Sequence, residues 1–231
     1  MKLTKKLASI AATGLMAAAL VLTGCGNQGA SATSAAADDS ANITTLTVGF
    51  DKSYPPYGFM DQKTGEYTGF DLELAKEVCK RNNWELALEP IDWDAKDSLL
   101  NSGEITCIWN GFTLEGREDD YTFSDPYMLN GQVVVVKKDS GIKSLADLKG
   151  KVVITQTDSA ALDLLQGDKK DVADTFKKLE TIGDYNTAFM QLESGAVDAV
   201  ACDLSIAQYQ LSAKPDAYAQ LDETLSSEHY A

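Results

Sequence analysis

The apolar and polar positions along the chain form two kinds of pattern, which alternate. From Phe70 to Cys79 apolar residues recur every third or fourth position, which predicts an amphipathic helix that ends near Asn82. Short runs rich in β-branched and aromatic residues lie on either side of such segments, as is typical of strands. This order of elements predicts an α/β fold in which helices pack on a mostly parallel sheet.

The pattern divides the chain into two successive α/β lobes. In the first lobe we expect, in order, strand 46–51, a stiff loop 54–57 containing two prolines, hairpin 58–67, helix 70–82, strand 84–91, helix 94–101 and strand 105–110. In the second lobe we expect strand 132–137, strand 151–155, helix 159–166, strand 175–179, helix 187–194, strand 197–202 and helix 205–211. The predicted lobes are residues 43–130 and 131–231, with a hinge at Asn130-Gly131, and each is long enough to bury its own core.

The first residues have the features of a secretory signal, predicted for residues 1–24. A basic start precedes an apolar run that ends in Leu22-Thr23-Gly24-Cys25. This end resembles a lipobox, so Cys25 is expected to be lipidated; the alternative is a stray cysteine in a small-residue cleavage site. Residues 25–42 contain few large apolar groups, which predicts a disordered tether.

Charge and residue usage exclude several classes of function. The chain carries 35 acidic and 20 basic residues, and this surplus of negative charge repels nucleic acid and anionic lipid. The single histidine, His229, lies near the end, so a Ser-His-Asp or Cys-His catalytic site lacks its parts. The spacing of Cys79, Cys107 and Cys202 gives no zinc motif. We therefore expect no enzyme, metal or cofactor; for the cysteines we favour buried thiols, with a Cys79–Cys107 disulfide as the alternative.

Residues with binding chemistry cluster where the predicted strands end. In open α/β sheets, ligands bind beyond the carboxyl ends of the strands. The candidates at these ends are Asp51, Tyr54, Trp93, Asn110, Gly111, Thr113 and Arg117.

Two motifs in order resemble a known family. Gly69-Phe70-Asp71-Leu72-Glu73-Leu74, followed after three residues by Val78-Cys79, matches the signature of bacterial extracellular solute-binding proteins, family 3. Residues 50–57 resemble the first ligand loop of that family, and the similarity runs from Leu46 to the end. It implies a two-lobe, type II periplasmic-binding-protein-like fold. It also implies a monomeric, lipid-anchored receptor outside the cell membrane (periplasmic in a two-membrane cell) that closes on a polar amino acid and delivers it to an ABC permease.

The resemblance assigns roles to individual residues. Arg117 would hold the ligand's α-carboxylate, with Thr113 as a hydroxyl donor and the Gly111 carbonyl facing the ammonium. Ser159 would assist in the second lobe, and Asp203 would pair with the ammonium. Tyr54 and Trp93 would form aromatic walls around the ligand's side chain, and Asp51 would make a polar or cation contact with it.

Some alternatives and departures remain. Arg117 is also compatible with a surface pair to Glu115 or Asp119, Asp203 with a helix N-cap, and Trp93 with packing between loops. Only three residues separate Thr113 from Arg117, where many members have four. In the loop that usually reads Gln-x-Gly-Ser-Ser/Thr, this chain has Asp158 in place of glycine and Ala160 in place of the second hydroxyl residue. That carboxylate would repel a ligand carboxylate unless it points away or meets a cation.

The end of the chain departs from the family pattern. Members return to the first lobe through a strand and finish with two helices there, but this sequence stops at 226–231, where that strand would begin. We therefore expect the C-terminal return to be missing through truncation. Two alternatives to transport also remain: a catalytic relative of the fold (a dehydratase or a glycan-cleaving enzyme) and an amino-acid sensor without transport.

Overall fold

The computed structural model describes residues 44–231. The predicted signal peptide 1–24, the lipidated Cys25 and the tether 25–42 therefore lie outside the described residues. Among the described helices, none combines the length and apolarity needed to cross a bilayer.

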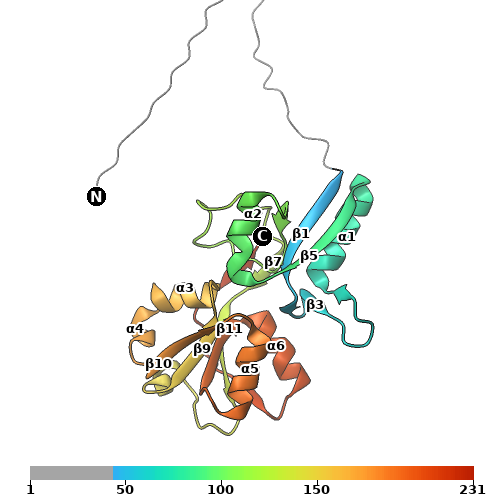
Figure 1. Cartoon of the computed structure of the whole chain (residues 1–231). Coiled ribbons are helices and arrows are strands. Elements are labelled where there is room, and N and C mark those ends of the chain that lie inside the picture. The colour runs from blue at the N-terminus through green and yellow to red at the C-terminus, as the bar shows by residue number, and fades with distance from the viewer. Residues whose placement is uncertain (1–43) are drawn as a thin grey trace, which may run out of the picture. The chain divides into compact units, whose positions relative to one another are not determined.

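The first lobe is built on a parallel sheet of three strands in the order β5-β1-β6 (Figure 1). Its strands are β1 (Thr45–Asp51), β5 (Glu85–Ile91) and β6 (Cys107–Ile108). The intervening helices are α1 (Phe70–Asn82), the 3-10 helix η1 (Trp93–Ala95) and α2 (Lys96–Ser102). The predicted order of strands and helices is confirmed. Strand β6 is shorter than expected because the chain leaves the sheet at Asn110, whose side-chain oxygen accepts from the Asp51 amide at 2.9 Å.

Helix α1 buries the apolar stripe from which it was predicted. Leu72, Ala75 and Cys79 are buried, and Leu72 and Ala75 pack with residues of β1. Gly69 precedes the helix with φ 137, and a Cβ there would lie 2.1 Å from the Tyr57 carbonyl oxygen, so only glycine fits. The helix ends in a left-handed Asn83.

A small antiparallel sheet in the order β2-β3-β4 connects β1 to α1. Its strands are β2 (Ser53–Tyr54), β3 (Gly58–Met60) and β4 (Tyr67–Thr68). The pairing of β3 with β4 confirms the predicted hairpin.

The second lobe is built on a mixed sheet of five strands in the order β10-β9-β11-β8-β12. Its strands are β8 (Gln132–Lys137), β9 (Val152–Gln156), β10 (Lys178–Ile182), β11 (Ala199–Asp203) and β12 (Tyr218–Gln220). Its helices are the 3-10 helix η2 (Leu145–Leu148), α3 (Ala160–Gln166), α4 (Lys170–Ala173), α5 (Tyr185–Ser194) and α6 (Leu204–Ala213). Strands β9, β10 and β11 are parallel, and β8 runs antiparallel to β11 and β12.

The valine run of β8 explains why this sheet is buried on both faces. Val133 and Val135 pack in one apolar cluster with residues of α5 and α6. Val134 and Val136 belong to a second cluster with residues of α3. Because successive strand residues point to opposite faces, an unbroken apolar run is what a strand covered on both sides requires.

Some predicted bounds in the second lobe are wrong. Strand β10 begins three residues later than predicted because the preceding residues form α4 and a turn, in which the Thr175 amide donates to the Val172 carbonyl at 3.1 Å. Strand β12 was not predicted. It is only three residues long and lies at the edge of the sheet.

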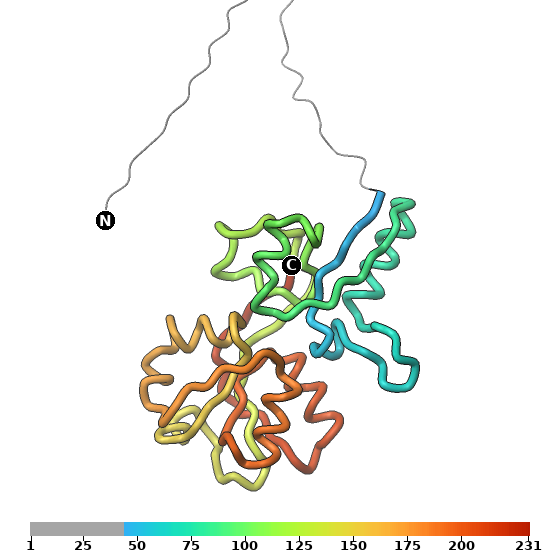
Figure 2. Tube along the Cα trace, viewed as in Figure 1, coloured from blue at the N-terminus to red at the C-terminus, as the bar shows by residue number. Residues whose placement is uncertain are grey.

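The C-terminal end corrects the prediction that the return to the first lobe is missing. Strand β13 (Glu228–Tyr230) pairs antiparallel with β7 (Met128–Asn130). The Ala231 amide then donates to the Phe112 carbonyl at 3.1 Å. The C-terminal end therefore lies against the loop that follows β6, as the trace in Figure 2 shows, and two chain segments connect the lobes. The exact lobe boundaries, 43–130 and 131–231, stay a prediction.

The three described cysteines form no disulfide. Cys79 and Cys202 are buried, and Cys107 is half-buried, where burial raises the pKa of its thiol to about 11. The expectation of buried thiols therefore agrees with the structure for two of the three, and the alternative Cys79–Cys107 bridge does not form.

A mostly apolar groove of about 540 Å³ lies beside β6 in the first lobe. Its lining includes Leu46, Val78, Trp84, Trp109 and Tyr127. None of the eight predicted ligand residues lines this groove, so the candidate site lies elsewhere.

Candidate functional site

Seven of the eight predicted ligand residues line one small cavity between the lobes, with a volume of about 20 Å³. The seven are Tyr54, Trp93, Gly111, Thr113, Arg117, Ser159 and Asp203. They come from β2, η1, the loop after β6, the start of α3 and the end of β11. These positions follow the carboxyl ends of parallel strands in both sheets, as the α/β rule predicts. A volume this small holds about one water, so a larger molecule enters only if the surrounding contacts part.

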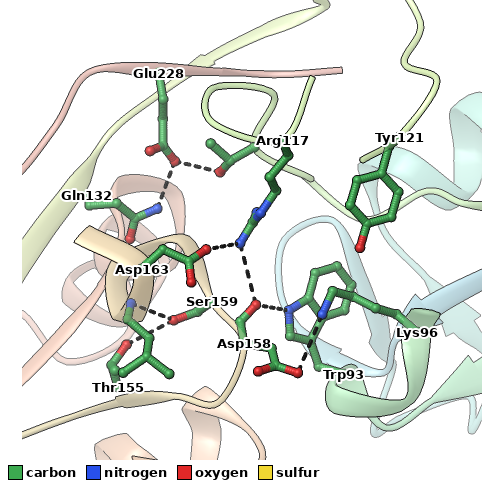
Figure 3. A network of polar contacts seen from close by, with 12 residues as sticks. Trp93, Lys96, Arg117, Tyr121, Gln132, Thr155, Asp158, Ser159, Asp163 and Glu228 are labelled. Carbon is green, nitrogen blue, oxygen red and sulfur yellow. Dashed lines mark hydrogen bonds and ion pairs between the residues drawn. The ribbon is translucent and has the colours of Figure 1, made fainter. Parts of the chain in front are cut away.

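Arg117 reaches across to the second lobe. Its guanidinium donates to the Asp163 carboxylate at 2.8 Å and to the Asp158 carbonyl at 3.5 Å (Figure 3). It lies over the Phe112 ring, 4.9 Å from the centroid, and the side chain is 12% exposed. The alternative surface pairs with nearby acidic residues do not form, because the partner is Asp163 on α3. Sequence reasoning missed Asp163, since the two residues are 46 positions apart and no local pattern connects them.

Asp158 lies at the meeting point of the two lobes. Its carbonyl accepts from the Trp93 indole at 3.2 Å, and its carboxylate lies 3.8 Å from the Lys96 ammonium. Asp158 has φ 54, a left-handed conformation that glycine adopts more readily than aspartate. Its carboxylate thus meets a cationic side chain, which is one of the two arrangements that avoid repelling an anionic ligand. Trp93 is buried, lines the cavity and also connects the lobes.

Thr113 is already hydrogen-bonded through its side chain. Its hydroxyl donates to the Glu228 carboxylate at 2.7 Å. A hydroxyl has one hydrogen, so in this arrangement its oxygen is free only to accept. The predicted role of Thr113 as a donor would require that hydrogen bond to be released.

Asp203 is a buried carboxylate surrounded by donors. Its Oδ1 accepts from Gln132 at 2.6 Å, from Asn130 at 2.9 Å and from the Tyr230 hydroxyl at 3.0 Å. Burial, with the neighbouring Glu228 carboxylate as the second cause, raises the pKa of Asp203. The side chain makes no capping hydrogen bond to α6, so the N-cap alternative is not realised by the carboxylate.

Glu228 is a second buried carboxylate at this point, and sequence reasoning missed it. Its Oε1 accepts from the same two amides as Asp203, Gln132 at 2.7 Å and Asn130 at 2.8 Å. Both amides turn their nitrogen toward the carboxylates. Among the described residues, their oxygens have no hydrogen-bond partner. Two buried carboxylates and two unsatisfied acceptors favour a cation nearby.

Asp51 does not contact the cavity directly but is hydrogen-bonded to a residue that lines it. Its carboxylate accepts from the Ser53 amide and from the Gln156 side chain, both at 2.7 Å. Burial raises the pKa of Asp51 to about 6. Gln156 is on β9 of the second lobe, so its hydrogen bond to Asp51 connects the lobes. Gln156 lines the cavity, whereas Asp51 does not.

Gly111 and Asp71 shape the loop that carries Thr113. Gly111 has φ 47, and a Cβ there would lie 2.9 Å from the Tyr230 ring, so a side chain would not fit. Its amide donates to the Asp71 carboxylate at 2.6 Å, and Tyr127 donates to the same carboxylate at 2.9 Å. Asp71 is fully buried, and burial raises its pKa to about 6. Asp71, which belongs to the family signature, therefore holds the loop that carries Gly111 and Thr113 through its carboxylate.

We expect Asp71→Asn to remove a pH dependence of stability. An aspartate whose pKa is raised on folding stabilises the fold fully below about pH 4, and that contribution is lost as the pH rises through its folded pKa, about 6. The free energy of unfolding of the wild type should therefore fall relative to the variant by about 2 to 3 kcal/mol between pH 4 and 7.5. Urea unfolding across this range measures it, with the exposed Glu73→Gln as a control of equal charge change. Parallel profiles for wild type and Asp71→Asn would contradict the assignment.

Comparison with known families identifies the chain. Residues 46–186 match the model of bacterial extracellular solute-binding proteins, family 3. The chain belongs to this family, and its mixed α/β fold is the type II periplasmic-binding-protein fold.

Individual relatives and solved structures agree. The chain is 34% identical over 198 residues to the L-cystine-binding protein TcyA of Bacillus subtilis, covering 83% of this chain and 71% of the relative. It is 33% identical over 190 residues to the glutamine-binding protein of Geobacillus stearothermophilus, covering 80% and 70%. Among solved structures, a Streptococcus pneumoniae ABC uptake transporter substrate-binding protein with bound histidine superposes with a TM-score of 0.77 at 32% identity, covering 81% and 78%. An ancestral arginine-binding protein bound to arginine gives 0.73 at 38% identity, covering 82% and 83%.

Proposed function

We propose that this protein is the extracytoplasmic receptor of an ABC importer and binds one free polar amino acid between its lobes. The observation that supports this most is that opposite charges line one cavity, Arg117 from the first lobe and the buried Asp203 from the second. A free amino acid carries a carboxylate and an ammonium on one carbon. Taking it out of water requires a cation for the first and a carboxylate for the second.

Five of the lining residues have a role in binding the ligand in this proposal. Arg117 binds the α-carboxylate with its planar pair of donors, and the Ser159 hydroxyl assists from the start of α3. Asp203 binds the ammonium, and Glu228 adds negative charge beside it. Tyr54 and Trp93 flank the ligand's side chain.

In this proposal the lobes close on the ligand, and the contacts that join them are those of the closed form. Three of these contacts are Arg117 with Asp163, Trp93 with the Asp158 carbonyl, and Gln156 with Asp51. In the proposed cycle these contacts part to admit the ligand and the lobes close around it. The ligand must bind the closed form better than the open one, since otherwise the permease receives no signal.

Relatives and neighbours support the ligand class. Their names include cystine-, glutamine-, histidine- and arginine-binding proteins. The ligands in these names are all polar amino acids, and each name describes a binding protein. Of the two alternatives, a catalytic relative gains no support from them. A sensor would use the same site with a different membrane partner.

The export and anchoring of the receptor belong to the same proposal. A signal peptide over residues 1–24, lipidation of Cys25 and a tether over 25–42 would hold the binding lobes at the outer face of the membrane. A diacylglycerol on Cys25 supplies two chains, which anchor far more firmly than one.

A thermal-shift screen of the chain from Gly26 onward tests the proposed function. The probes are the twenty amino acids, cystine and ornithine. A ligand at about a hundred times its dissociation constant adds roughly 2.7 kcal/mol to the stability, a shift of a few degrees or more. We expect a response to one or two amino acids only. A folded sample that responds to none would contradict the proposal.

A further inference from the structure

A second cavity, of about 360 Å³, adjoins the candidate site at Arg117. Arg117 lines both cavities. The charged groups of the second one are Lys96, Asp97, Arg117, Asp120, Asp158 and Asp163. The two cavities are therefore neighbours, and the second one holds cations and carboxylates side by side.

Lys96 is the unusual group of this cavity. It is the first residue of α2, and its side chain is only 4% exposed. Its ammonium lies 3.8 Å from the Asp158 carboxylate and 5.2 Å from the centre of the Trp93 ring, as Figure 3 illustrates. Within residues 44–231 it makes no hydrogen bond. An ammonium has three hydrogens to donate, and Lys96 lines this cavity, so its ammonium can donate to a molecule bound there.

Two other charged groups of the cavity, Asp97 and Arg117, have hydrogen-bond partners. The Tyr121 hydroxyl donates to Asp97, and the Arg117 guanidinium is hydrogen-bonded to Asp163. Lys96 and Asp158 form a loose pair of opposite charges, close enough to attract each other but not joined by a hydrogen bond.

This loose pair selects among ligand charges. A cationic side chain entering here would face the Lys96 ammonium, and an anionic one would face Asp158 and Asp163. A zwitterion can place its carboxylate on Lys96 and its ammonium on Asp158, so that every charge keeps a partner of opposite sign.

We propose that Lys96 and Asp158 bind a second amino-acid head group. The ligand would then be a diamino-dicarboxylic acid of the cystine type, with one head between Arg117 and Asp203 and the other between Lys96 and Asp158. Trp93 lines the first cavity and touches both residues of the second, so its ring flanks the chain that joins the two heads. This inference rests on the proposed function, because it uses the same site.

Calorimetric titration with matched ligands tests it. The probes are L-cystine, which has two heads, and S-methyl-L-cysteine, which has one head and the same first side-chain atoms. We expect the wild type to bind cystine at least a hundredfold more tightly than S-methylcysteine. Lys96→Met should weaken cystine binding at least tenfold and leave S-methylcysteine binding unchanged, and Asp158→Asn should also weaken cystine binding at least tenfold. Lys80→Met, at an exposed lysine on α1, is the control and should change neither.

The outcomes separate this inference from the proposed function. Binding of another amino acid, with cystine no tighter than S-methylcysteine, overturns the second head-group site and leaves the receptor function standing. An equal loss for both probes in Lys96→Met, in a variant whose thermal midpoint is unchanged, also overturns it, because Lys96 would then act on closure. If no amino acid binds the folded wild type, the proposed function itself fails.

Discussion

Replacing Arg117 with alanine is expected to abolish amino-acid binding and to leave the fold intact. Among residues 44–231, Arg117 is the only cationic residue that lines the first cavity, so the ligand carboxylate in the variant would be desolvated without a counter-charge. Truncating one partner of a buried charge pair costs about 2 to 5 kcal/mol, a loss of at least thirtyfold and up to several thousandfold in affinity. The Asp163 left behind is 61% exposed and can be solvated, so the thermal midpoint should change little.

Titration with the amino acid that the screen selects measures this prediction. Arg81→Ala is the matched control, because Arg81 is exposed on α1 and pairs only with Glu77 at 2.8 Å. Arg117→Lys should bind with intermediate affinity, since lysine keeps the charge but loses the planar pair of donors. A loss of affinity smaller than thirtyfold in Arg117→Ala would overturn the assignment.

Asp203→Asn is expected to reduce binding at least a hundredfold without lowering the stability of the fold. The amide keeps an oxygen that can accept from Gln132, Asn130 and Tyr230, but it removes the negative charge that the ligand ammonium needs. Burial and Glu228 raise the pKa of Asp203, which means that its ionised form costs the folded state free energy. Neutralising it should therefore leave the free energy of unfolding at neutral pH equal or higher.

The two readouts of Asp203→Asn separate function from stability. Titration should show weakened binding, and urea unfolding at pH 7 should show an unchanged or raised free energy of unfolding. Asp198→Asn serves as a comparison, since Asp198 holds the start of β9 through its hydrogen bond to the Val152 amide at 2.8 Å and lies outside the cavity. It should lose stability and keep affinity. Full affinity in Asp203→Asn would show that the ammonium binds elsewhere.

The sequence predicted the elements that have a strong period. The stripe of α1 and the valines of β8 each show one pattern over many residues, and both elements appear with the predicted bounds or within a residue of them. Strands β12 and β13 have three residues each, too few to show a period. Periodicity therefore could not show that the C-terminal residues return to the first lobe, although the family pattern placed the beginning of a return strand at 226–231.

The site was predictable as a set of positions but not as a set of contacts. Eight ligand residues were predicted from the rule that ligands bind at the carboxyl ends of strands, together with the family motifs. Seven of the eight line one cavity. The partners of these residues come from distant parts of the chain. Glu228 is 115 positions from Thr113, and Asp163 is 46 positions from Arg117. Only the packing of the two lobes brings such pairs together.

Asp158 shows how a departure from the family pattern becomes intelligible in three dimensions. In the sequence it stands as a carboxylate where glycine is usual, close to an expected anion. In the structure its left-handed backbone explains why glycine suits the position, and Lys96 supplies the counter-charge. Lys96 itself carried no signal, because a lysine at the start of a helix is ordinarily exposed.

Titration of the screened amino acid into the wild-type chain shows whether the cavity between the lobes is an amino-acid site. We expect saturable binding of one ligand per chain in the micromolar range or tighter, lost when the α-carboxylate is converted to an amide. Saturable binding that is indifferent to that change would contradict the roles of Arg117 and Asp203. The absence of saturable binding by any amino acid would contradict the receptor function as a whole.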